Sequence, residues 1–453
     1  MAETLMTEGS YRRKIIGFAV PVFLGQLFAQ LYNVIDSLIV GRFVGSAALA
    51  AVSSSGNLIF LVTGFFEGMS IGASVVIAQH IGAKRQDRIE KSVHTAVALA
   101  LMSSVLLSVI GLVLAPPVLR WMGTPETVMP ESLVYFRILF GGGTGMVLAS
   151  IFNSILRAAG DSRHPLIFLV CASLLNVTLD LCFIVVLDWG VAGAGAATVL
   201  SQFFSAFLAM GYLMRSREAY RFVPSKIRIS VPVLLRIIRF GLPSGLQGSM
   251  ISISNVLIQS FVNYFGEMAM AGIGAYSKLE GFAFLPTICF SMAMTTFIGQ
   301  NVGAGNRQRT KDGIRFGLLC TLASAEIIGL LLWIFAEPLI ALFDETPEVV
   351  FYGVQRARVT SLFFCLVAYT HVMSAIIRGL GRSVTPMVVM MLCWCAVRVV
   401  VLAATAPFFH SIQLTHWIYP ATWGLSSMVY FFYYRHMNVD QLDIWGEAQD
   451  SAS

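Results

Sequence analysis

The chain has 453 residues, of which 57% are hydrophobic and only 12% are charged. A soluble globule of this length needs much more polar surface, so the composition excludes a water-soluble protein and indicates a lipid-solvated chain. The formal net charge of +6 arises from basic residues on one side of the predicted spans. It therefore requires no nucleic-acid partner, and we expect none.

Twelve apolar segments are each long enough to cross about 30 Å of hydrocarbon as an α-helix. In chain order they are 15–40, 47–78, 92–114, 131–156, 165–187, 191–214, 237–263, 269–299, 313–335, 349–377, 386–408 and 415–434. The sequence thus predicts an all-α polytopic membrane protein with twelve transmembrane helices.

The twelve predicted spans divide into two lobes of six. We expect a cytoplasmic N-terminal segment (1–14), an N-lobe (15–214), a cytoplasmic linker (215–236), a C-lobe (237–435) and a cytoplasmic polar tail (436–453). An even number of spans per lobe makes the two lobes parallel repeats, related by a pseudo-twofold axis along the membrane normal.

Two polar patterns support this duplication. The sequence QHIGAKR, which starts at Gln79, recurs as QNVGAGN from Gln300, an offset of 221 residues. ILRAAGDSRHP, which contains Arg157, recurs as IIRGLGRSVTP around Arg378 at the same offset of 221. Self-similarity of this kind in a membrane chain is typical of a duplicated transporter.

Lysine and arginine predict the orientation, because basic residues are retained on the cytoplasmic side during insertion. Of the 30 basic residues, 23 fall in loops on one side and only Arg42 and Arg120 in loops on the other. We therefore expect a multi-pass protein of the plasma membrane with both termini in the cytoplasm. All seven cysteines fall within predicted helices, so we expect neither a disulfide nor a zinc site.

Four polar residues of the N-lobe are expected at a similar membrane depth. Asp36 lies about five residues from the outer end of its span and Asp180 about seven from the outer end of its own. Asn176 lies one turn below Asp180, and Thr198 enters from the outside at a similar level. Carboxylates persist at membrane depth when they face protein, water or an ion. We expect the four side chains to converge.

This predicted site has two chemical uses. Two carboxylates at short range in a low-dielectric site cannot easily both stay ionised, so one would hold a proton. Hard oxygen ligands from Asp36, Asn176, Asp180 and Thr198 would equally suit Na+. The site is therefore a candidate for coupling to H+ or Na+. The competing interpretation is structural, with the amide and hydroxyl serving helix packing and the acids capping or pairing near the interface.

Four further charges are candidates for substrate binding or for structural ion pairs: Glu67, Lys278, Glu280 and Arg398. Lys278 and Glu280 are two residues apart and cannot face each other on one helix, so Arg398 is the expected partner of Glu280. Glu67, toward the cytoplasm, could attract a cationic substrate. The sequence has no HExxH or GxSxG motif, so we expect no enzyme and no cofactor beyond the coupling ion.

The duplicated halves and their two polar turns resemble the multidrug and toxic compound extrusion (MATE) family over residues 11–435. Within this resemblance, the Asp36 cluster looks like the first-lobe cation site of the DinF-like branch. Tyr135 resembles a tyrosine associated with that site. Pro21 resembles the proline at which the first helix bends. The second-lobe acids known from the NorM-like branch have no counterpart here.

The resemblance implies a secondary active antiporter that exports amphipathic or cationic organic compounds in exchange for H+ and/or Na+ by alternating access of two lobes. Its partners would be such small molecules and membrane lipid, and we expect a monomer. Two alternatives within the superfamily are a lipid-linked precursor flippase and a metabolite exporter. The number of spans and the few arginines at mid-depth argue against the flippase, whereas the metabolite exporter stays open.

Overall fold

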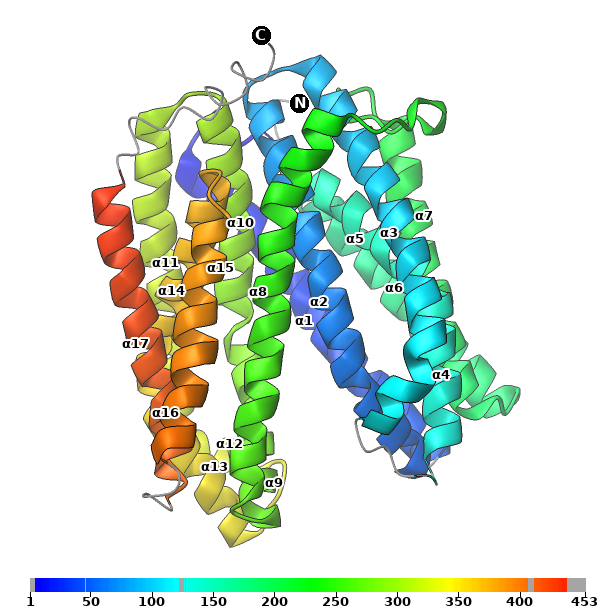
Figure 1. The fold of residues 1–453 in the computed structure, drawn as a ribbon, viewed down its shortest axis with the longest axis vertical. Helices are drawn as coiled ribbons and strands as arrows, with labels where there is room; N and C mark the ends of the chain where they lie inside the picture. The colour runs from blue at the N-terminus through cyan, green and yellow to red at the C-terminus, as the bar shows by residue number, and fades with distance from the viewer. Residues whose placement is uncertain (1–4, 45, 122–125, 127, 406–410, 438–453) are drawn as a thin grey trace. The chain divides into compact units, whose positions relative to one another are not determined.

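The computed structural model describes residues 5–44, 46–121, 126, 128–405 and 411–437 (Figure 1). The first half contains α1 (Tyr11–Phe43), α2 (Ser46–Gly82), α3 (Gln86–Trp121), α4 (Met129–Gly141), α5 (Gly143–Ala158), α6 (Arg163–Asp180), η1 (Leu181–Val186), α7 (Gly190–Arg215) and η2 (Pro224–Lys226). The second half contains α8 (Val231–Asn263), α9 (Glu267–Ala283), α10 (Leu285–Gly303), α11 (Arg307–Ile334), α12 (Ala336–Ala341), α13 (Pro347–Thr360), η3 (Ser361–Phe363), α14 (Phe364–Gly379), α15 (Val384–Met390), η4 (Met391–Val397), α16 (Arg398–Thr405) and α17 (Gln413–His436).

The all-α prediction is confirmed over the described residues, where every regular element is a helix. Within them, eight helices are long and apolar enough to cross a membrane, or nine if the bent pair α4 and α5 forms one span. The long helices α2, α8 and α17 occupy the three other predicted spans. Each predicted span thus coincides with one helix or with consecutive helices, apart from residues 406–408, which lie outside the described residues.

The chain forms two compact units. Among the described residues, the first comprises Leu5 and residues 24–245, and the second comprises residues 6–23 and 246–437. The division therefore falls within α1 and within α8. In both helices it lies two residues beyond a proline, Pro21 or Pro243. The linker 215–236 belongs to the first unit, so the units of the structure do not begin and end with the sequence repeats.

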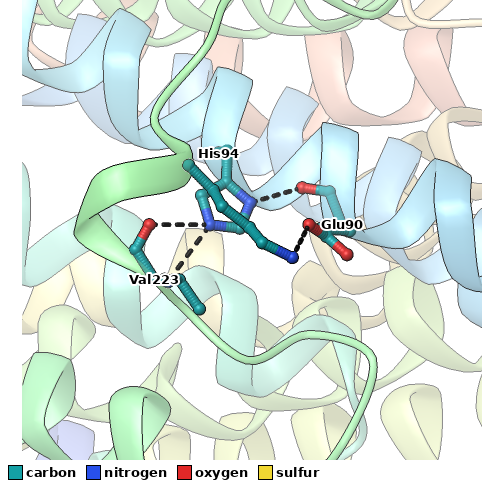
Figure 2. Close-up of polar contacts among 4 residues, drawn as sticks. Glu90, His94 and Val223 are labelled. Carbon is teal, nitrogen blue, oxygen red and sulfur yellow. Dashed lines mark hydrogen bonds and ion pairs between the residues drawn. The ribbon is translucent and has the colours of Figure 1, made fainter.

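Hydrogen bonds hold this linker on α3 (Figure 2). The buried His94 ring donates from Nδ1 to the Glu90 carbonyl at 2.7 Å, and its Nε2 accepts from the Val223 N–H at 3.1 Å. An ion pair of 2.8 Å between Lys226 Nζ and Glu90 Oε1 lies beside it. The partly buried backbone of the linker at Val223 thus obtains a hydrogen-bonding partner from α3, which explains why the linker packs with the first unit.

His94→Ala should make the linker more accessible to trypsin. The substitution leaves a buried backbone N–H without its partner, at a cost of roughly 1–3 kcal/mol, which would raise the population of the open linker about tenfold or more. Limited proteolysis followed by mass spectrometry measures cleavage after the basic residues between 215 and 228. Lys91→Ala, which removes only an exposed pair with Asp87, should leave the cleavage rate unchanged. Equal rates in His94→Ala and wild type would show that the histidine does not hold the linker.

The second repeated turn depends on glycine at one position. Gly160 and Gly381 have φ values of 88° and 89°, a conformation that favours glycine over residues with a side chain. Three residues before each glycine, Arg157 and Arg378 donate to a serine hydroxyl on their own helix, at 3.0 and 2.9 Å. The repeated R-x-x-G spacing therefore ends a helix with a charged side chain folded back along it.

Gly381→Ala should destabilise the protein by about 1–2 kcal/mol, because alanine is strained at this φ value. Gly274→Ala is the matched control. A Cβ at Gly274, in the interior of α9, meets nothing within 4 Å, so alanine there should be neutral or stabilise by up to about 1 kcal/mol. Thermal unfolding in detergent compares the two, and equal melting temperatures would contradict the assignment.

The repeated glutamines anchor two helix starts. In the first unit, Gln79 Oε1 accepts from Arg236 Nη2 at 2.8 Å; in the second, Gln300 Oε1 accepts from the Met6 N–H at 2.8 Å. Arg236 lies near the start of α8, and Met6 precedes α1. Each glutamine therefore fixes the start of a helix whose remainder belongs to the other unit. This explains why the glutamine occurs once in each half.

Candidate functional site

The structure brings the predicted N-lobe site together within the first unit. Asp36 comes from α1, Tyr135 from α4, Asn176 and Asp180 from α6, and Thr198 from α7. Asp36 is only 9% exposed and Asp180 is fully buried. A pair of buried acids needs partners to offset the cost of desolvation, and their neighbours supply these in part.

Asn176 links two helices of the site. In the amide orientation that satisfies both neighbours, its Nδ2 donates to Asp180 Oδ2 at 2.9 Å and its oxygen accepts from the Thr198 backbone N–H at 3.2 Å. Asn176 and Asp180 lie one helical turn apart on the same face, which is why the amide reaches the carboxyl group. The amide thereby orients Asp180 and ties α6 to α7.

The two acids form a dyad. The carboxyl groups of Asp36 and Asp180 lie close enough to interact directly, and two buried carboxyl groups at short range cannot easily both stay ionised. Among the described residues, Oδ1 of each acid is buried without a hydrogen-bonding partner. The dyad therefore offers unpartnered carboxyl oxygens to a proton, a metal cation or an organic cation.

Two tyrosines complete the polar cluster. The Tyr32 side chain lies close to that of Thr198 and interacts electrostatically with both acids. The buried Tyr135 also interacts electrostatically with both acids. The sequence prediction included Tyr135 but missed Tyr32. Tyr32 precedes Asp36 by four residues on one helix, so their spacing alone was a usable signal.

Glycines allow the helices of the site to approach closely. A Cβ at Gly142, between α4 and α5, would lie 2.2 Å from Val199 Cγ1, and one at Gly195 on α7 would lie 3.3 Å from the Tyr135 ring. The first distance is far shorter than any normal contact, so only glycine fits without rearrangement. This packing sets Tyr135 beside the α7 turn that carries Thr198.

A π-helical segment, η1, begins directly after Asp180. Short π-helical segments are rare and occur frequently at functional sites, where they widen one turn of a helix. Their place is not visible in the hydrophobic pattern. The C-terminal end of α6, which carries Asp180, is thus locally irregular. An acid that only capped a helix or packed against a neighbour would not require such a segment.

The remaining predicted residues lie elsewhere. Glu67 on α2 is exposed and interacts electrostatically with Arg157. Lys278 on α9 is exposed, with its Nζ 5.8 Å from the centre of the Phe343 ring. Pro21 lies in the interior of α1, which continues through it as a helix.

Glu280 has a different principal neighbour from the one expected. Its Oε1 accepts from the Tyr276 hydroxyl at 3.2 Å. Arg356 exerts the larger electrostatic effect on it and Arg398 the smaller. Among the described residues, no ion pair shorter than 4.0 Å joins Glu280 to Arg398. Arg356 lies on another helix, α13, and nothing in the sequence pattern indicates that it approaches Glu280.

No group of three or more His, Cys, Asp or Glu side chains that could hold a metal ion occurs in the described part of the chain. A cation at the dyad would therefore be bound by two carboxyl groups together with neutral oxygens. Such a ligand set suits a proton or an alkali cation better than a transition metal, which prefers nitrogen and sulfur.

The comparisons with known proteins agree with this fold. A model of the MatE family matches residues 21–182 and 243–403. The chain is 28% identical over 437 residues to the probable multidrug resistance protein YoeA of Bacillus subtilis (strain 168), covering 95% of this chain and 94% of that protein. It is 26% identical over 345 residues to the FAD transporter of Shewanella oneidensis, covering 74% and 75%.

A solved structure extends the likeness to the whole fold. The outward-facing conformation of a multidrug resistance MATE family transporter of the MOP superfamily has a TM-score of 0.89 at 22% identity, and the match covers 98% of this chain and 99% of that one. The predicted architecture of twelve spans in two lobes is thereby confirmed. Because the family model covers most of both halves, the chain belongs to the MatE, or multidrug and toxic compound extrusion, family of membrane transporters.

Proposed function

We propose that this transporter is a secondary active antiporter that exports amphipathic or cationic organic compounds. The observation that carries the proposal is the buried pair of Asp36 and Asp180, whose carboxyl groups interact directly and keep one unpartnered oxygen each. The relative named as a probable multidrug resistance protein supports the substrate class. The plasma membrane as location, cytoplasmic termini and a monomeric state belong to the same proposal.

The dyad can couple two solutes because they compete for it. When both carboxyl groups are ionised, their repulsion in a buried site is relieved by a proton, a sodium ion or a cationic substrate nearby. If the ion favours one of the inward-facing and outward-facing states and the substrate favours the other, release of one drives binding of the other. Exchange then follows without any covalent step.

Within this proposal, the arrangement of Asn176 favours the proton over sodium. Its NH2 group faces Asp180, and its oxygen already accepts from the Thr198 N–H. A sodium ion would have only the second lone pair of that oxygen, whereas a proton shared between the acids needs no further ligand. The expected coupling ion is thus H+, with Na+ as the competing case.

Proteoliposomes test the proposal. Protein reconstituted in one orientation is loaded with a fluorescent organic cation, and a pH gradient or a sodium gradient is imposed separately. We expect the pH gradient alone to drive export. Export driven only by the sodium gradient would still support antiport, but with Na+ rather than H+ as the coupling ion. Transport that responds to neither gradient would refute antiport.

A metabolite exporter is the second candidate, because one relative is named as an FAD transporter. FAD carries negative phosphates, which an ionised acid dyad would repel. The proposal therefore expects organic cations to compete with one another for export and FAD to leave their transport unchanged. Competition by FAD, with direct uptake of labelled FAD, would favour the metabolite.

We further propose that Pro21 is a hinge in α1. It lies two residues before the point at which α1 passes from the second unit to the first, and an interior proline removes a backbone hydrogen bond. Pro21 precedes Asp36 by fifteen residues, about 22 Å along a straight helix. An ion at the dyad is therefore too far away to contact Pro21. It would act on this hinge only by changing how the outer segment of α1 packs against its neighbours.

Pro21→Ala should keep ion binding at the acids yet slow export by about tenfold or more, since stiffening a hinge of a two-state element raises the barrier to its movement. A spin-label pair across the outer half of α1 should then stop responding to pH. Normal export together with an unchanged spin-label response would remove Pro21 from the mechanism.

A further inference from the structure

A cluster of two buried arginines against one tyrosine lies in the second unit, on helices that the proposed coupling site does not use. Arg356 of α13 and Arg398 of α16 place their guanidinium carbons 4.0 and 4.2 Å from the centre of the Tyr419 ring of α17. The two arginines are only 4% and 1% exposed. We call Arg356, Arg398 and Tyr419 the arginine cluster. Both helices pack on α17 within this unit (Figure 1).

The charges of the arginine cluster are not balanced. Over the described residues, one carboxylate is recorded as acting on it, that of Glu280 on α9, and this group interacts with both arginines. The Tyr276 hydroxyl donates to that carboxylate at 3.2 Å. Two guanidinium groups against one carboxylate leave one positive charge in a region that excludes water. A buried charge without a counter-charge is costly, and contact with a tyrosine ring offsets only part of that cost.

Arg356 and the neighbouring His416 carry buried nitrogen atoms without partners among the described residues. Arg356 donates from Nη1 to the Thr415 carbonyl, but its Nε is buried without a partner among the described residues. His416, which is fully buried one turn before Tyr419, interacts electrostatically with Arg356. Neither ring nitrogen of His416 has a partner among the described residues. These unmet hydrogen bonds and the unbalanced charge call for the same kind of group, an anionic acceptor.

The local backbone is also unusual. Arg398 directly follows the π-helical segment η4, and its Nε and Nη2 donate to the Thr422 hydroxyl at 3.2 and 2.9 Å. Segments of this kind are often found at functional sites. In this chain a π-helical segment adjoins the buried charge in both halves, after Asp180 in one and before Arg398 in the other.

We propose that the arginine cluster, with His416, binds a small monovalent anion, either a halide or the carboxylate group of an organic molecule. Arginine guanidinium and imidazole N–H groups are the donors that proteins use for such anions. The bound anion supplies the missing negative charge and accepts from Arg356 Nε. This site is independent of the Asp36–Asp180 dyad and of the ion coupled there.

Iodide quenching of tryptophan fluorescence tests the site, because Trp394 lies 5.3 Å from the guanidinium carbon of Arg398. Full-length protein in nanodiscs is titrated with iodide, with methanesulfonate, which has no carboxylate group, holding the ionic strength constant. We expect a saturable component that Trp394→Phe removes. Displacement of iodide by chloride would identify a halide site, and displacement by acetate or benzoate alone would identify a carboxylate site. Quenching without a saturable component would overturn the proposal.

The charge balance predicts opposite effects of two neutralising substitutions. Arg356→Gln should weaken iodide binding about tenfold or more, because it removes a charged donor. Glu280→Gln should tighten binding about tenfold, since it removes the counter-charge that interacts with both arginines. Lys278→Gln, two residues away on α9 with an exposed side chain, is the matched control and should change nothing.

A folding defect would not obscure the result. Should Arg356→Gln unfold, Arg356→Lys keeps the charge but lacks Nε and the planar fork, so it should bind iodide more weakly than wild type does. Equal affinity in wild type, Arg356→Lys and Glu280→Gln would show that the cluster is a structural arrangement without an anion site.

Discussion

Asp180→Asn and Asp36→Asn should each abolish gradient-driven export while the protein remains folded and inserted. An amide cannot carry the exchangeable proton, so either substitution leaves only one titratable carboxyl group in the interacting pair. We expect export to fall by about 100-fold or more, the range seen when a positioned group that transfers protons is removed. Efflux of a fluorescent cation from proteoliposomes under an imposed pH gradient measures the loss.

Two controls separate coupling from folding. Asp188→Asn removes an acid that is exposed and has a φ value of 53°, a conformation that asparagine tolerates well, so transport should remain normal. Counterflow exchange of labelled for unlabelled substrate, without any gradient, should persist in Asp180→Asn if only coupling is lost. Wild-type export by either dyad variant would exclude the acids from the coupling step.

Asn176 should show an intermediate effect for the same geometric reason. It touches Asp180 and the Thr198 backbone but carries no titrating group. Its role is to orient the acid, so the dyad without it would keep its proton and lose its alignment. The measurement would thus distinguish the role of the Asn176 amide from that of the two carboxyl groups. The sequence pattern alone had grouped all of them as equivalent ligands.

The convergence of Asp36, Asn176, Asp180 and Thr198 could be predicted because depth along a membrane helix is set by residue count. A rise of about 1.5 Å per residue and a turn of 3.6 residues fix the level and face of each side chain before any packing is known. The same rule applied to Tyr32 would have added it. The number of spans followed from composition for a similar reason, since hydrocarbon thickness sets the helix length.

Contacts between helices were not predictable to the same degree. Arg356 has a larger electrostatic effect on Glu280 than Arg398 has, because α13 packs closely on α9. The sequence of each helix taken alone does not contain the distance between two helices. The π-helical segments beside Asp180 and Arg398 were equally hidden, because an irregular turn leaves the apolar run uninterrupted. The passage of α1 and α8 from one unit to the other also depends on packing, although the repeated prolines Pro21 and Pro243 mark its place.

Glu280→Gln should destabilise the protein by about 3 kcal/mol or more, because it leaves the two arginines beside Tyr419 without their counter-charge. Chemical unfolding in detergent, with methanesulfonate as the only added anion, measures this loss. The double variant Glu280→Gln/Arg356→Met should be milder, since it removes one of the two positive charges together with the carboxylate.

If the arginine cluster binds an anion, the stability of Glu280→Gln should also depend on the anion present. Chloride should restore part of the stability of Glu280→Gln, because an anion that binds only the folded state stabilises it by mass action, and it should restore little in the double variant. Lys278→Gln should be indifferent to the salt. If Glu280→Gln is destabilised and no anion restores its stability, Glu280 acts as a structural counter-charge and the arginine cluster does not bind an anion. An unchanged stability would instead mean that the Tyr419 ring and the Thr415 and Thr422 oxygens already suffice for both arginines.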